Sequence, residues 1–521
     1  MNHFFFIYGP SGSGKSTLGR RIAKNLALPF FDLDGEIEAR ARQNVAGIFT
    51  TRGEAGFRRL EASCLADLLA GPAAVVALGG GSLLDQPSRA RVEAAGQVLC
   101  LTADLPCLMD RLQSAPRQRP LLGAPNELQA RLSSLLEARS QHYASFALKL
   151  DTSHLPIHQA AFAAQARLGA FRVNGMGPAY DVRVIRGGLT SLGEMVCRAG
   201  LKGPLFLVSD AHTGPLYAET AAASLEGAGF RVAQAYLPAG EEHKTMETVQ
   251  SLWQGFLAAG LERSSTLVAL GGGVTGDLAG FAAATYLRGV RWVNVPTTLL
   301  AMVDAGLGGK TGANLPQGKN LVGAFHPPSL VLVDPDLLAS LPQVELRNGL
   351  AEVVKHGLIG DPALFDHCAA GWEGVTGNLD VLVRRAMAVK IRLIQADPYE
   401  KGPREALNLG HTVGHALEKA SGYRLRHGEA VSIGLVCETR LAERLGLARP
   451  GLADSVASVL AGLGLPVQLP AEIDPERLLE AMQYDKKKAG GSLRLSLPQR
   501  IGKVKTGIII PGEELSWMLK I

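Results

Sequence analysis

Three histidines within residues 404–429 have the side chains and spacing of a metal or proton-transfer site. His411 and His415 are four residues apart, so on a helix they lie on one face, one turn apart. His427 follows a break at Gly422, where we expect the chain to turn back toward the first helix. Histidine is the commonest metal ligand and the usual proton carrier near neutral pH. Taken alone, this spacing more often marks solvent-facing or hydrogen-bonded core histidines, so a metal site requires partners elsewhere in the chain.

Candidate partners for these histidines occur in two places. Arg404 and Asn408 precede His411 at helical spacing and are expected to extend its face by further turns. Glu352 and Lys355 are three residues apart in a segment of helical pattern, so they share a face as well. An exposed ion pair is the ordinary interpretation of an isolated Glu/Lys pair, whereas a pair beside a polar pocket is expected to belong to it.

A second kind of chemistry is indicated by the run GPSGSGKST at residues 9–17. The apolar run Phe4–Tyr8 precedes it and a helical pattern follows, which is the strand, glycine loop and helix arrangement that binds nucleotide phosphates. The glycines let backbone N–H groups surround the β-phosphate, Lys15 adds positive charge, and the Ser16 hydroxyl can hold Mg²⁺. This stretch predicts a nucleoside triphosphate site.

Acidic and basic side chains that could serve a second substrate follow this loop. Asp32 and Asp34 alternate at the end of an expected strand at 30–34 and so would share a face. Arg58 and Arg139 lie in expected helices further along. Each arginine by itself is more typical of a surface charge, but together they supply cations for a carboxylate and for a transferring phosphoryl group.

A glycine run at residues 271–273 follows a buried strand at 266–270 and precedes a helical pattern at 275–285. A glycine turn at a helix N-terminus binds pyrophosphate in dinucleotide-binding folds. The run is not GxGxxG, so a dinucleotide site and a simple tight turn both remain open for it. Loops rich in glycine, hydroxyl groups and lysine follow at 296–320, and this composition is typical of anion-binding cradles.

The elements expected to position these residues fall into three domains, all consistent with an α/β fold class. Residues 1–168 alternate strands and helices around the phosphate loop, which predicts an α/β domain similar to the nucleoside monophosphate kinases. Residues 169–178 lose periodicity among glycines and are expected to be a linker. Residues 179–335 alternate strands and helices again, which predicts a parallel sheet that carries the glycine turn as a candidate dinucleotide site. Residues 336–521 are expected to form an all-α domain that carries the three histidines as candidate metal ligands.

The composition is that of an ordinary globular protein and restricts its partners. The 521 residues carry a net charge of +5 and are 47% apolar, which suits about three domains and anionic small-molecule substrates. No basic run is long or aromatic enough to indicate nucleic-acid binding. The apolar run Phe4–Tyr8 is too short for a signal or membrane segment. Six cysteines without CxxC spacing indicate reduced thiols and a cytoplasmic location.

Residues 1 to about 165 resemble a shikimate kinase, through the motifs GPSGSGKST, DLD, GEAGFR, LGGGS, RPLL and R…Y in this order. The resemblance implies phosphorylation of shikimate by ATP and Mg²⁺, with Asp34 taking the proton of the attacking hydroxyl and Arg119 in a closing lid. The implied ligands are Gly12, Gly14, Lys15, Ser16 and Thr17 for ATP, Ser16 and Asp32 for Mg²⁺, and Asp34, Arg58, Gly80 and Arg139 for shikimate. A GTP-dependent switch is disfavoured because the chain lacks a base-reading TKxD run.

Residues 179–521 resemble a 3-dehydroquinate synthase along their whole length. The motifs that carry this resemblance are LPAGEEHKT, GGGVTGDLAGF, YLRG, PTTLLAMVDAGLGGKTGAN, GKNLVGAFHPP, GLAEVVKHGLI, REALNLGHTVGHALE, HGEAV and DKK. The resemblance implies cyclisation of 3-deoxy-D-arabino-heptulosonate 7-phosphate to 3-dehydroquinate with loss of phosphate, by a homodimer that uses NAD and either Zn²⁺ or Co²⁺. The NAD would accept a hydride and return it within one turnover.

The same resemblance implies a ligand for each site residue. Glu352, His411 and His427 would hold the metal. The residues implied for NAD are Asp210, Glu241, Lys244, Gly272, Gly273, Val274, Asp277, Thr297, Thr298, Asp304 and Lys319. Those implied for the substrate are Arg288, Lys310, Asn320, Lys355, Arg404, Asn408, His415, Lys486 and Lys487, of which Lys310, Arg404 and His415 would take part in catalysis.

Two positions depart from the pattern of the synthase family. Ala305-Gly306 stands where the family usually has two serines, so two hydroxyl groups near the nicotinamide are missing. His212 stands where asparagine is common, on the adenosine side of the implied NAD site. Neither change removes Asp304 or Lys310.

Two alternative functions can be considered for the same residues. A metal-dependent polyol or alcohol dehydrogenase would use a similar glycine turn and helical metal domain, but it would not need the phosphate cradle at 308–320 or Glu352 as a ligand. A half that had become a regulatory module would be expected to lose its chemical residues, and both halves keep theirs.

Overall fold

The computed structural model describes residues 4–114, 127–488 and 493–519, and the side chains of all of these except 483–488. The chain forms two compact units, Met1–Arg172 and Val173–Ile521, called here the N-terminal and C-terminal units. The division between them falls within the expected linker at 169–178 and inside the short strand β6 (Ala170–Val173).

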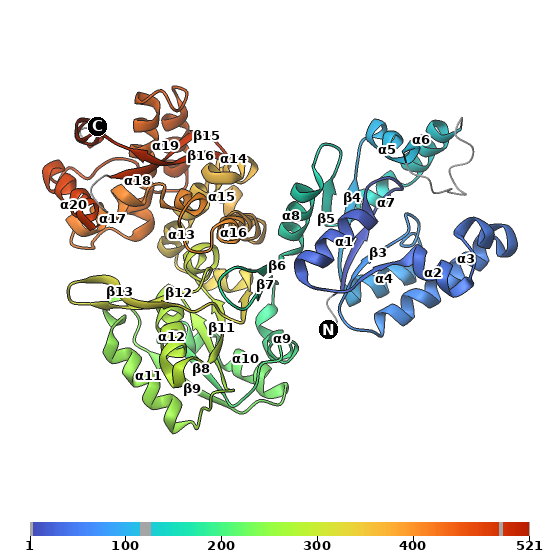
Figure 1. Ribbon diagram of the computed structural model, residues 1–521, viewed down its shortest axis with the longest axis horizontal. Coiled ribbons are helices and arrows are strands. Elements are labelled where there is room, and N and C mark those ends of the chain that lie inside the picture. The colour runs from blue at the N-terminus through green and yellow to red at the C-terminus, as the bar shows by residue number, and fades with distance from the viewer. Residues whose placement is uncertain (1–3, 115–126, 489–492, 520–521) are drawn as a thin grey trace. The chain divides into compact units, whose positions relative to one another are not determined.

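The N-terminal unit is built on a parallel five-stranded sheet in the order β2-β3-β1-β4-β5 (Figure 1). Its central strand β1 (Phe4–Tyr8) is entirely buried, which explains its continuous apolar sequence. The other strands are β2 (Phe30–Asp32), β3 (Val75–Ala77), β4 (Gly96–Thr102) and β5 (Leu148–Asp151). The helices are α1 (Lys15–Leu26), α2 (Leu33–Ala41), α3 (Val45–Leu69), α4 (Gln86–Ala95), α5 (Leu105–Gln113), α6 (Leu128–Ala138), α7 (Ser140–Ala144) and α8 (Ile157–Leu168).

The loops that follow β1, β2 and β3 all leave the same edge of this sheet, where parallel α/β proteins bind their ligands. One sequence expectation is wrong here. Strand β2 ends at Asp32, and Asp34 lies in the first turn of α2 rather than on a strand face shared with Asp32. A carboxylate is favoured in this first turn because the helix dipole is positive there.

The C-terminal unit contains a second parallel sheet, in which six strands follow the order β7-β14-β11-β10-β8-β9. The strands are β7 (Tyr180–Val184), β8 (Leu205–Asp210), β9 (Val232–Leu237), β10 (Thr266–Gly271), β11 (Arg291–Pro296) and β14 (Leu330–Val333). The connecting helices are α9 (Leu192–Arg198), α10 (Gly214–Gly227), α11 (Met246–Ala258) and α12 (Gly273–Thr285). An antiparallel hairpin, β12 (Lys310–Leu315) and β13 (Gly318–Phe325), extends from this part. The parallel sheet confirms the predicted α/β class.

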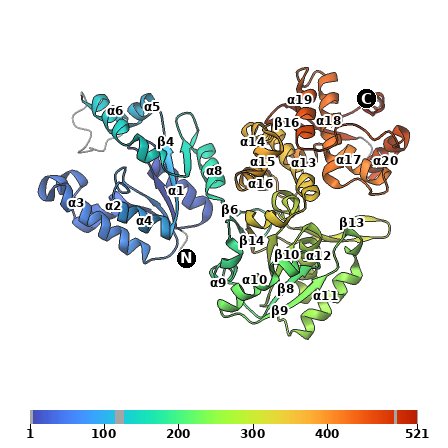
Figure 2. The same cartoon turned by 180° about the vertical axis from the view of Figure 1, so that it is seen from behind.

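The remainder of the C-terminal unit is helical, as expected (Figure 2). The helices are α13 (Gln343–Gly360), α14 (Pro362–Cys368), α15 (Gly371–Thr376), α16 (Leu379–Ala396), α17 (His411–Ala420), α18 (His427–Arg444), α19 (Leu452–Gly462), α20 (Pro475–Lys488) and α21 (Gly512–Met518), with a short 3₁₀ helix η7 (Pro403–Asn408) before α17. This part also contains an antiparallel hairpin, β15 (Arg494–Arg500) and β16 (Lys503–Ile509), which the all-α expectation did not include. Within the described ranges, none of the helices combines the length and the apolar character needed to cross a bilayer.

Candidate active sites

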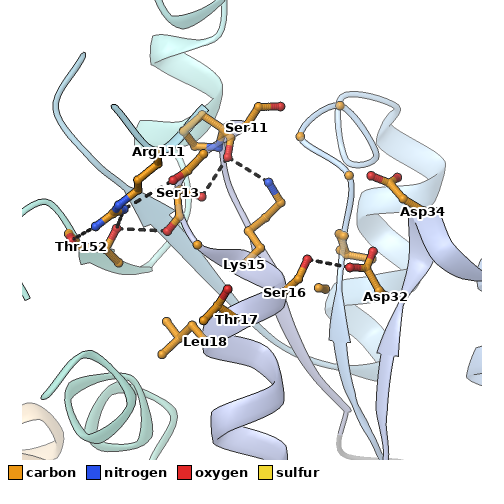
Figure 3. A pocket seen from close by; sticks show the side chains of 18 of the residues that line it. Ser11, Ser13, Lys15, Ser16, Thr17, Leu18, Asp32, Asp34, Arg111 and Thr152 are labelled. Atoms are coloured by element: carbon orange, nitrogen blue, oxygen red, sulfur yellow. Dashed lines mark hydrogen bonds between the residues drawn. The ribbon is translucent and has the colours of Figure 1, made fainter. Parts of the chain in front are cut away.

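The phosphate loop of the N-terminal unit joins β1 to α1, and hydrogen bonds already hold its polar side chains (Figure 3). Lys15 Nζ donates to two backbone carbonyl oxygens of the loop, each at 2.9 Å. The Ser16 hydroxyl donates to Asp32 Oδ2 at 2.6 Å, so two oxygen ligands suited to Mg²⁺ lie side by side. Gly14 has a φ of +90° and no neighbour within 4 Å of a Cβ placed there, which leaves its backbone open to a ligand. This loop fits a nucleoside triphosphate with its cation.

A cavity of about 640 Å³ extends from the loop to the residues expected to bind the second substrate. Its volume is ordinary for a small-molecule site. The sequence-predicted residues among its lining are Gly12, Gly14, Lys15, Ser16, Thr17, Asp32, Asp34, Arg58, Gly80 and Arg139. The structure therefore brings the predicted nucleotide and acceptor residues to one space, whereas Arg119 lies outside the described residues.

Three donors converge on the Gly80 carbonyl oxygen in this cavity. The Tyr143 hydroxyl donates at 2.9 Å, Arg139 Nη1 at 3.0 Å and the Tyr8 hydroxyl at 3.2 Å. Burial raises the pKa of Tyr8 and of Tyr143, so both remain protonated donors. The Tyr8 hydroxyl also lies 3.1 Å from His142 Nε2. Sequence reasoning missed Tyr8, although a tyrosine at the end of an otherwise Phe/Ile strand beside a phosphate loop was a usable signal.

Arg58 is held toward the cavity by carboxylates of its own helix, α3. Its Nη1 lies 2.6 Å from Glu61 Oε2 and its Nη2 lies 3.3 Å from Glu54 Oε1. Burial would lower the pKa of Arg58, but Glu61 and Glu54 more than offset this and raise it, so the guanidinium stays charged. Glu61 is buried and also accepts the Ser82 hydroxyl at 2.5 Å. Glu61 was not predicted, although it lies three residues after Arg58 on one helix face.

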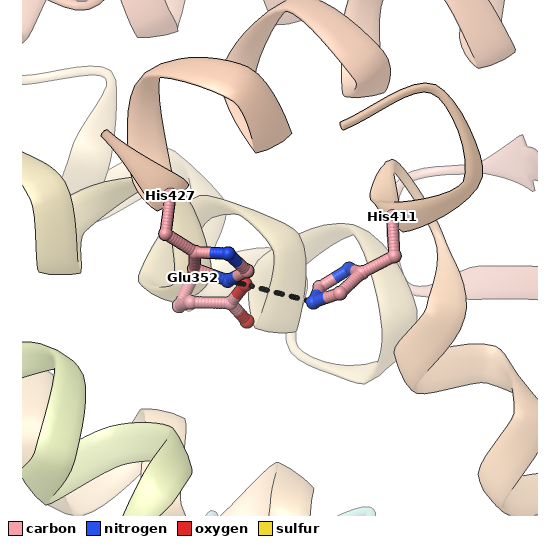
Figure 4. Close-up of side chains that lie close together, drawn as sticks. All are labelled: Glu352, His411 and His427. Carbon is pink, nitrogen blue, oxygen red and sulfur yellow. Dashed lines mark ion pairs between the residues drawn. The ribbon is translucent and has the colours of Figure 1, made fainter. Parts of the chain in front are cut away.

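In the C-terminal unit, Glu352 of α13, His411 of α17 and His427 of α18 form a compact cluster (Figure 4). Glu352 Oε1 lies 3.5 Å from Nε2 of each histidine. Glu352 is fully buried; its Oε2 pairs with Lys355, while its Oε1 faces the two histidines. The ligand atoms of the three residues lie within 4.8 Å of one another, an arrangement that suits a shared cation. One carboxylate and two imidazoles fit a divalent metal that keeps open positions for a substrate.

The opposite nitrogen of each imidazole is occupied, so Nε2 faces the cluster. His411 Nδ1 lies 3.3 Å from the Leu409 carbonyl oxygen, and His427 Nδ1 lies 3.3 Å from Glu418 Oε2. Such contacts fix the orientation of histidine ligands around a metal. Burial would lower the pKa of His427, but its hydrogen bonds to Glu352 and Glu418 raise it to about 9. Burial would raise the pKa of Glu418, but His427 lowers it to about 2.

Glu418 and the break before His411 were not foreseen. Glu418 follows His411 at i+7, so it lies on the same helix face as the predicted histidines and could have been found from that spacing. Arg404 and Asn408 belong to η7, and Gly410, with a φ of +78°, ends that element before α17 begins. The expectation of one continuous helical face from Arg404 to His411 is therefore wrong, because a left-handed residue interrupts the helix.

Lys355 and His415 contact the cluster, whereas the other expected substrate residues, Arg404 and Asn408, differ from each other in burial. Lys355 Nζ lies 2.5 Å from Glu352 Oε2 and donates to a backbone carbonyl at 2.8 Å. Both residues are buried, which excludes the exposed ion pair considered for them. Arg404 is buried, whereas His415 is exposed with its ring centroid 5.2 Å from that of His411. Asn408 is exposed at the end of η7.

The glycine turn of the second sheet caps a helix, as predicted. Gly272 is the N-cap of α12, and a Cβ on it would lie 3.2 Å from Thr298 Cγ2. A Cβ on Gly273 would lie 3.3 Å from the Cβ of Ala305. The turn and Lys310 border one small cavity. The hydroxyl of the neighbouring Thr297 is buried and has no hydrogen-bond partner among the described residues. These features fit a dinucleotide better than a simple tight turn.

The position that departs from the family pattern is tightly packed. A Cβ on Gly306 would lie 2.7 Å from the Ala301 carbonyl oxygen and 3.1 Å from Asn294 Nδ2. The same Asn294 amide donates to the Gly306 carbonyl oxygen at 3.3 Å. Glycine at this position is therefore required by its surroundings, and the missing hydroxyl of the usual serine reflects packing at this point.

The charged residues expected for NAD are held by other polar groups of the C-terminal unit. Lys244 Nζ lies 2.5 Å from Asp277 Oδ2 and donates to Asn320 Oδ1 at 2.6 Å. Asp210 Oδ1 accepts the backbone N–H groups of residues 212 and 213, and its Oδ2 accepts the Thr275 hydroxyl at 3.0 Å. The structure thus places Asn320, expected at the substrate, beside an expected NAD residue. Glu241 accepts a hydrogen bond from Asn314 at 2.8 Å, and Val274 lies in the first turn of α12.

Two charged partners of predicted residues were missed. Lys390 of α16 lies with its Nζ 2.5 Å from Asp304 Oδ1 and donates to the Asp304 carbonyl oxygen at 2.7 Å. Burial would raise the pKa of Asp304, but Lys390 lowers it well below its usual range. Glu400 forms an ion pair with Lys310. The only sequence signal for Lys390 was a lysine on the core-facing side of an amphipathic helix.

Some predicted residues are not brought to the cluster. Arg288 is exposed, has a φ of +67° and makes no hydrogen bond or ion pair with a described residue. Lys319 Nζ lies 3.3 Å from Glu418 Oε1 and 4.3 Å from the ring centroid of Tyr423. The side chains of Lys486 and Lys487 lie outside the described residues.

Three family models match successive parts of the chain. The model described as shikimate kinase matches residues 11–166. The models described as the N-terminal and C-terminal parts of 3-dehydroquinate synthase match residues 234–348 and 349–488. The matched segments contain the two candidate sites.

Curated relatives match the C-terminal part of the chain over nearly their whole length. A 3-dehydroquinate synthase from Synechococcus sp. is 46% identical over 351 residues, which are 66% of this chain and 95% of the relative. One from Symbiobacterium thermophilum is 45% identical over 347 residues, 66% of this chain and 97% of the relative.

Two solved structures of other synthases are similar as well. ValA, a 2-epi-5-epi-valiolone synthase from Streptomyces hygroscopicus subsp. jinggangensis with bound NAD⁺ and Zn²⁺, has a TM-score of 0.61 at 34% identity and covers 67% of this chain and 98% of its own. A 2-deoxy-scyllo-inosose synthase with carbaglucose-6-phosphate, NAD⁺ and Co²⁺ has a TM-score of 0.61 at 25% identity, with 67% and 99% covered.

Proposed function

Because this chain belongs to the 3-dehydroquinate synthase family and carries a shikimate kinase domain before the synthase part, we propose that the two clusters described above are its two active sites. The protein is a bifunctional enzyme of the shikimate pathway, with a kinase activity and a phosphate-lyase activity. The kinase uses ATP and Mg²⁺, and the synthase uses NAD with Zn²⁺ or Co²⁺.

In the kinase, the residues around the 640 Å³ cavity have different proposed roles. ATP with Mg²⁺ supplies the phosphoryl group, and Lys15 with the Ser16–Asp32 pair would hold its phosphates and cation. Arg58 and Arg139 would bind the shikimate carboxylate through charge-assisted hydrogen bonds. Asp34 lies on the acceptor side of the same cavity and would take the proton of the attacking hydroxyl. We propose Arg119 as a further cation of this site.

In the synthase, Glu352, His411 and His427 would hold the metal, which supplies polarisation of the substrate hydroxyl groups. NAD supplies a reversible hydride acceptor, and the glycine turn at Gly272 would receive its pyrophosphate. The residues proposed to bind NAD are those named above from Asp210 to Lys319. His415 lies at the exposed side of the cluster, 5.2 Å from the His411 ring, and would carry protons to and from the substrate.

The anionic groups of the heptulosonate phosphate need cations, and the synthase offers several. Lys310 on the β12–β13 hairpin borders the same cavity as the glycine turn, so it can act on a phosphate close to the nicotinamide. Lys355 is a buried cation that contacts Glu352, and Arg404 is a second buried cation of this unit. We propose that Asn320, Asn408, Lys486 and Lys487 complete the substrate contacts.

The convergence of the buried Glu352 carboxylate with the His411 and His427 imidazoles, whose Nε2 atoms each lie 3.5 Å from its Oε1, is the observation that carries this proposal. Separate assays of the purified chain test it: shikimate should drive ADP release, and the heptulosonate phosphate should drive phosphate release. Trace NAD⁺ should support many turnovers with one phosphate released per turnover and no NADH, because the hydride returns. NADH accumulating in step with substrate loss would favour a dehydrogenase instead.

We also propose that the synthase works as a homodimer in which Arg288 serves the site of the neighbouring subunit. Leu287 and Arg288 both have positive φ values, of +50° and +67°, and both are exposed. Strained, exposed residues of this kind occur at functional surfaces. Mixing Arg288→Ala with Lys310→Ala subunits should restore part of the synthase activity through hybrid sites. No recovery after verified subunit exchange would place Arg288 in the site of its own subunit.

We propose a cytoplasmic location, because all six cysteines are free thiols and four of them, Cys64, Cys100, Cys368 and Cys437, are buried with raised pKa values caused mainly by burial. Fractionation of the producing cells would test this location. The partners proposed beyond a second subunit are the small-molecule substrates alone.

A further inference from the structure

The chain enters the C-terminal unit through residues 174–179, called here the entry segment. This segment packs against the loop that carries Arg404. Gly175 has a φ of +100°, and a Cβ on it would lie 2.6 Å from Cγ of Pro398. The next residue, Met176, is 6% exposed, and its Sδ lies 4.0 Å from Nη1 of Arg404. The same Nη1 donates a hydrogen bond to the Pro398 carbonyl oxygen. Gly175 therefore packs against Pro398, whose carbonyl oxygen orients the guanidinium, and Met176 contacts Arg404 itself.

Arg404 is enclosed on its other sides by backbone that is itself fixed. Asp397 Oδ2 accepts the N–H groups of Gly402 at 2.7 Å and of Arg404 at 3.2 Å, which ties the loop into one conformation. A Cβ on Gly308 would lie 2.8 Å from Nη2 of Arg404, and the Gly308 N–H donates to the Tyr180 hydroxyl at 3.2 Å. Tyr180 belongs to β7, directly after the entry segment, so the beginning of the unit holds Arg404 from two sides.

Arg404 forms no ion pair with a carboxylate of the described residues. Backbone N–H groups, chiefly that of Lys401, lower the pKa of the nearby Asp397 carboxyl, and the charge of Arg404 helps to lower it further. Arg404 is 2% exposed. A buried guanidinium with a single carbonyl acceptor is unfavourable unless an anion joins it. Its position is therefore maintained by the packing around it, and an anionic substrate group would be its natural partner.

We propose that Gly175 and Met176, in the segment 174–179 that leads from the kinase into the synthase, are a structural part of the synthase substrate site because they position Arg404. This inference rests on the proposed function, in which Arg404 binds the substrate. Gly175 admits Pro398 at a distance that no side chain would allow, and the Pro398 carbonyl then sets the plane of the guanidinium. Met176 supplies a polarisable apolar wall behind it. Gly175 and Met176 are positioning residues, since they act through Arg404.

Two glycines of the entry segment provide a matched test in the full-length chain. Gly175 and Gly177 have similar left-handed φ values, +100° and +92°, but a Cβ on Gly177 would have no neighbour within 4 Å. Both alanine substitutions introduce backbone strain, and only Gly175→Ala pushes against Pro398. Gly175→Ala should raise the KM for the heptulosonate phosphate roughly tenfold, the effect of weakening one hydrogen bond to a charged group. Gly177→Ala should change this KM by less than roughly threefold, and shikimate kinase activity and bound metal should be unchanged in both.

Substitutions of Met176 test the same inference without backbone strain. Met176→Leu keeps the volume of the side chain and should behave as the unaltered enzyme, whereas Met176→Ala leaves a gap beside Arg404 and should raise the KM for the heptulosonate phosphate. A fold-wide defect would instead lower the apparent kcat and the metal content, or reduce kinase activity. Equal effects of Gly175→Ala and Gly177→Ala, combined with an unchanged KM for Met176→Ala, would overturn the inference.

Arg404→Lys separates this inference from the function on which it rests. If Arg404→Lys leaves the KM for the heptulosonate phosphate unchanged, the substrate role of Arg404 fails and the inference fails with it. If Arg404→Lys raises the KM and neither Gly175→Ala nor Met176→Ala does, Arg404 keeps its role and only the positioning by the entry segment is refuted.

Discussion

The Glu418 carboxylate lies 3.3 Å from Nδ1 of His427, while Nε2 of the same ring lies 3.5 Å from Glu352. Glu418→Gln removes the negative charge that orients this imidazole and makes it a better donor to a metal. We expect zinc or cobalt affinity to fall roughly 10–100-fold, the usual effect of losing such an outer carboxylate. Competition with a chromophoric chelator measures this affinity independently of activity.

Glu429→Gln is the matched control for that substitution. Glu429 lies two residues after His427 on α18, and its carboxylate accepts the Arg426 N–H at 2.8 Å, an acceptor role that an amide can also perform. The metal affinity of the Glu429→Gln variant should be unchanged. Equal losses of metal affinity in the two variants would mean that the charge of Glu418 does not act on the metal site through His427.

Metal binding should depend on pH through His427. In the metal-free protein the pKa of His427 is raised to about 9, so the imidazole is protonated at pH 7 and must lose this proton to become a ligand. Metal affinity should therefore rise with pH up to about 9 and then level off. Calorimetry in buffers of different ionisation enthalpy should find close to one proton released per metal at pH 7, and no release would contradict the raised pKa.

The same shift affects the stability of the metal-free synthase. The pKa of His427 in the folded protein is above its unfolded value of about 6.5. Protonated His427 therefore contributes stability that is fully present below about pH 6.5. This contribution should be lost as the pH rises through about 9. Denaturant unfolding of the metal-free chain at several pH values, followed by a probe in the C-terminal unit, measures it.

Lys15→Met should abolish the kinase and leave the synthase intact. The Lys15 ammonium group lies in the phosphate loop, where losing one preorganised charge typically costs at least roughly 100-fold in kcat. Lys24→Met, in the last turn of the same helix, should leave both activities unchanged. Kinase activity that survives Lys15→Met would place the ATP site elsewhere.

Lys390→Met should destabilise the C-terminal unit and lower synthase activity. It leaves the Asp304 carboxylate without its ion pair, and Asp304 retains 24% of its side-chain exposure. The loss should therefore be about 2–3 kcal/mol, below the range for fully buried pairs. Combining it with Asp304→Asn should recover part of this stability but none of the activity, because Asp304 is proposed to contact NAD. Denaturant titration of the single and double variants decides this.

Tyr8→Phe should weaken shikimate binding without affecting ATP. It removes one of the three donors to the Gly80 carbonyl oxygen, so the loop loses a net hydrogen bond of about 1 kcal/mol. The KM for shikimate should rise roughly fivefold, and Tyr143→Phe, whose hydroxyl is closer at 2.9 Å, should raise it at least as much. A rise in the KM for ATP instead would show that Tyr8 acts on the phosphate loop.

The parts of both sites that depend on local sequence could be predicted. The phosphate loop is a contiguous motif between a strand and a helix, and its Ser16–Asp32 contact follows from the parallel strands around it. Glu352, His411 and His427 are far apart in sequence, and the resemblance to a known family supplied the expectation that they meet. The structure places their ligand atoms within 4.8 Å of one another.

Sequence reasoning failed where a tertiary contact decides the conformation or the partner. A helical pattern from Arg404 to His411 cannot reveal that Gly410 adopts a left-handed conformation, because the carboxylate that accepts its N–H belongs to Glu438 of another helix. Lys390 and Glu400 are ordinary surface types in the sequence, and only the fold shows that they pair with Asp304 and Lys310.

The close packing at Gly306 restricts which side chains can occupy one of the two positions where the synthase pattern has serine. Ala305 already carries a side chain, so a serine there needs one more atom. A serine at Gly306 would meet the Ala301 carbonyl oxygen at 2.7 Å and the Asn294 amide at 3.1 Å, an overpacking of about 1–3 kcal/mol. A serine therefore fits this position only if Asn294 or the backbone near Ala301 moves. The choice of residue at 306 is thus set by two residues that precede it in the chain, and a substitution at 306 would test how far they can yield.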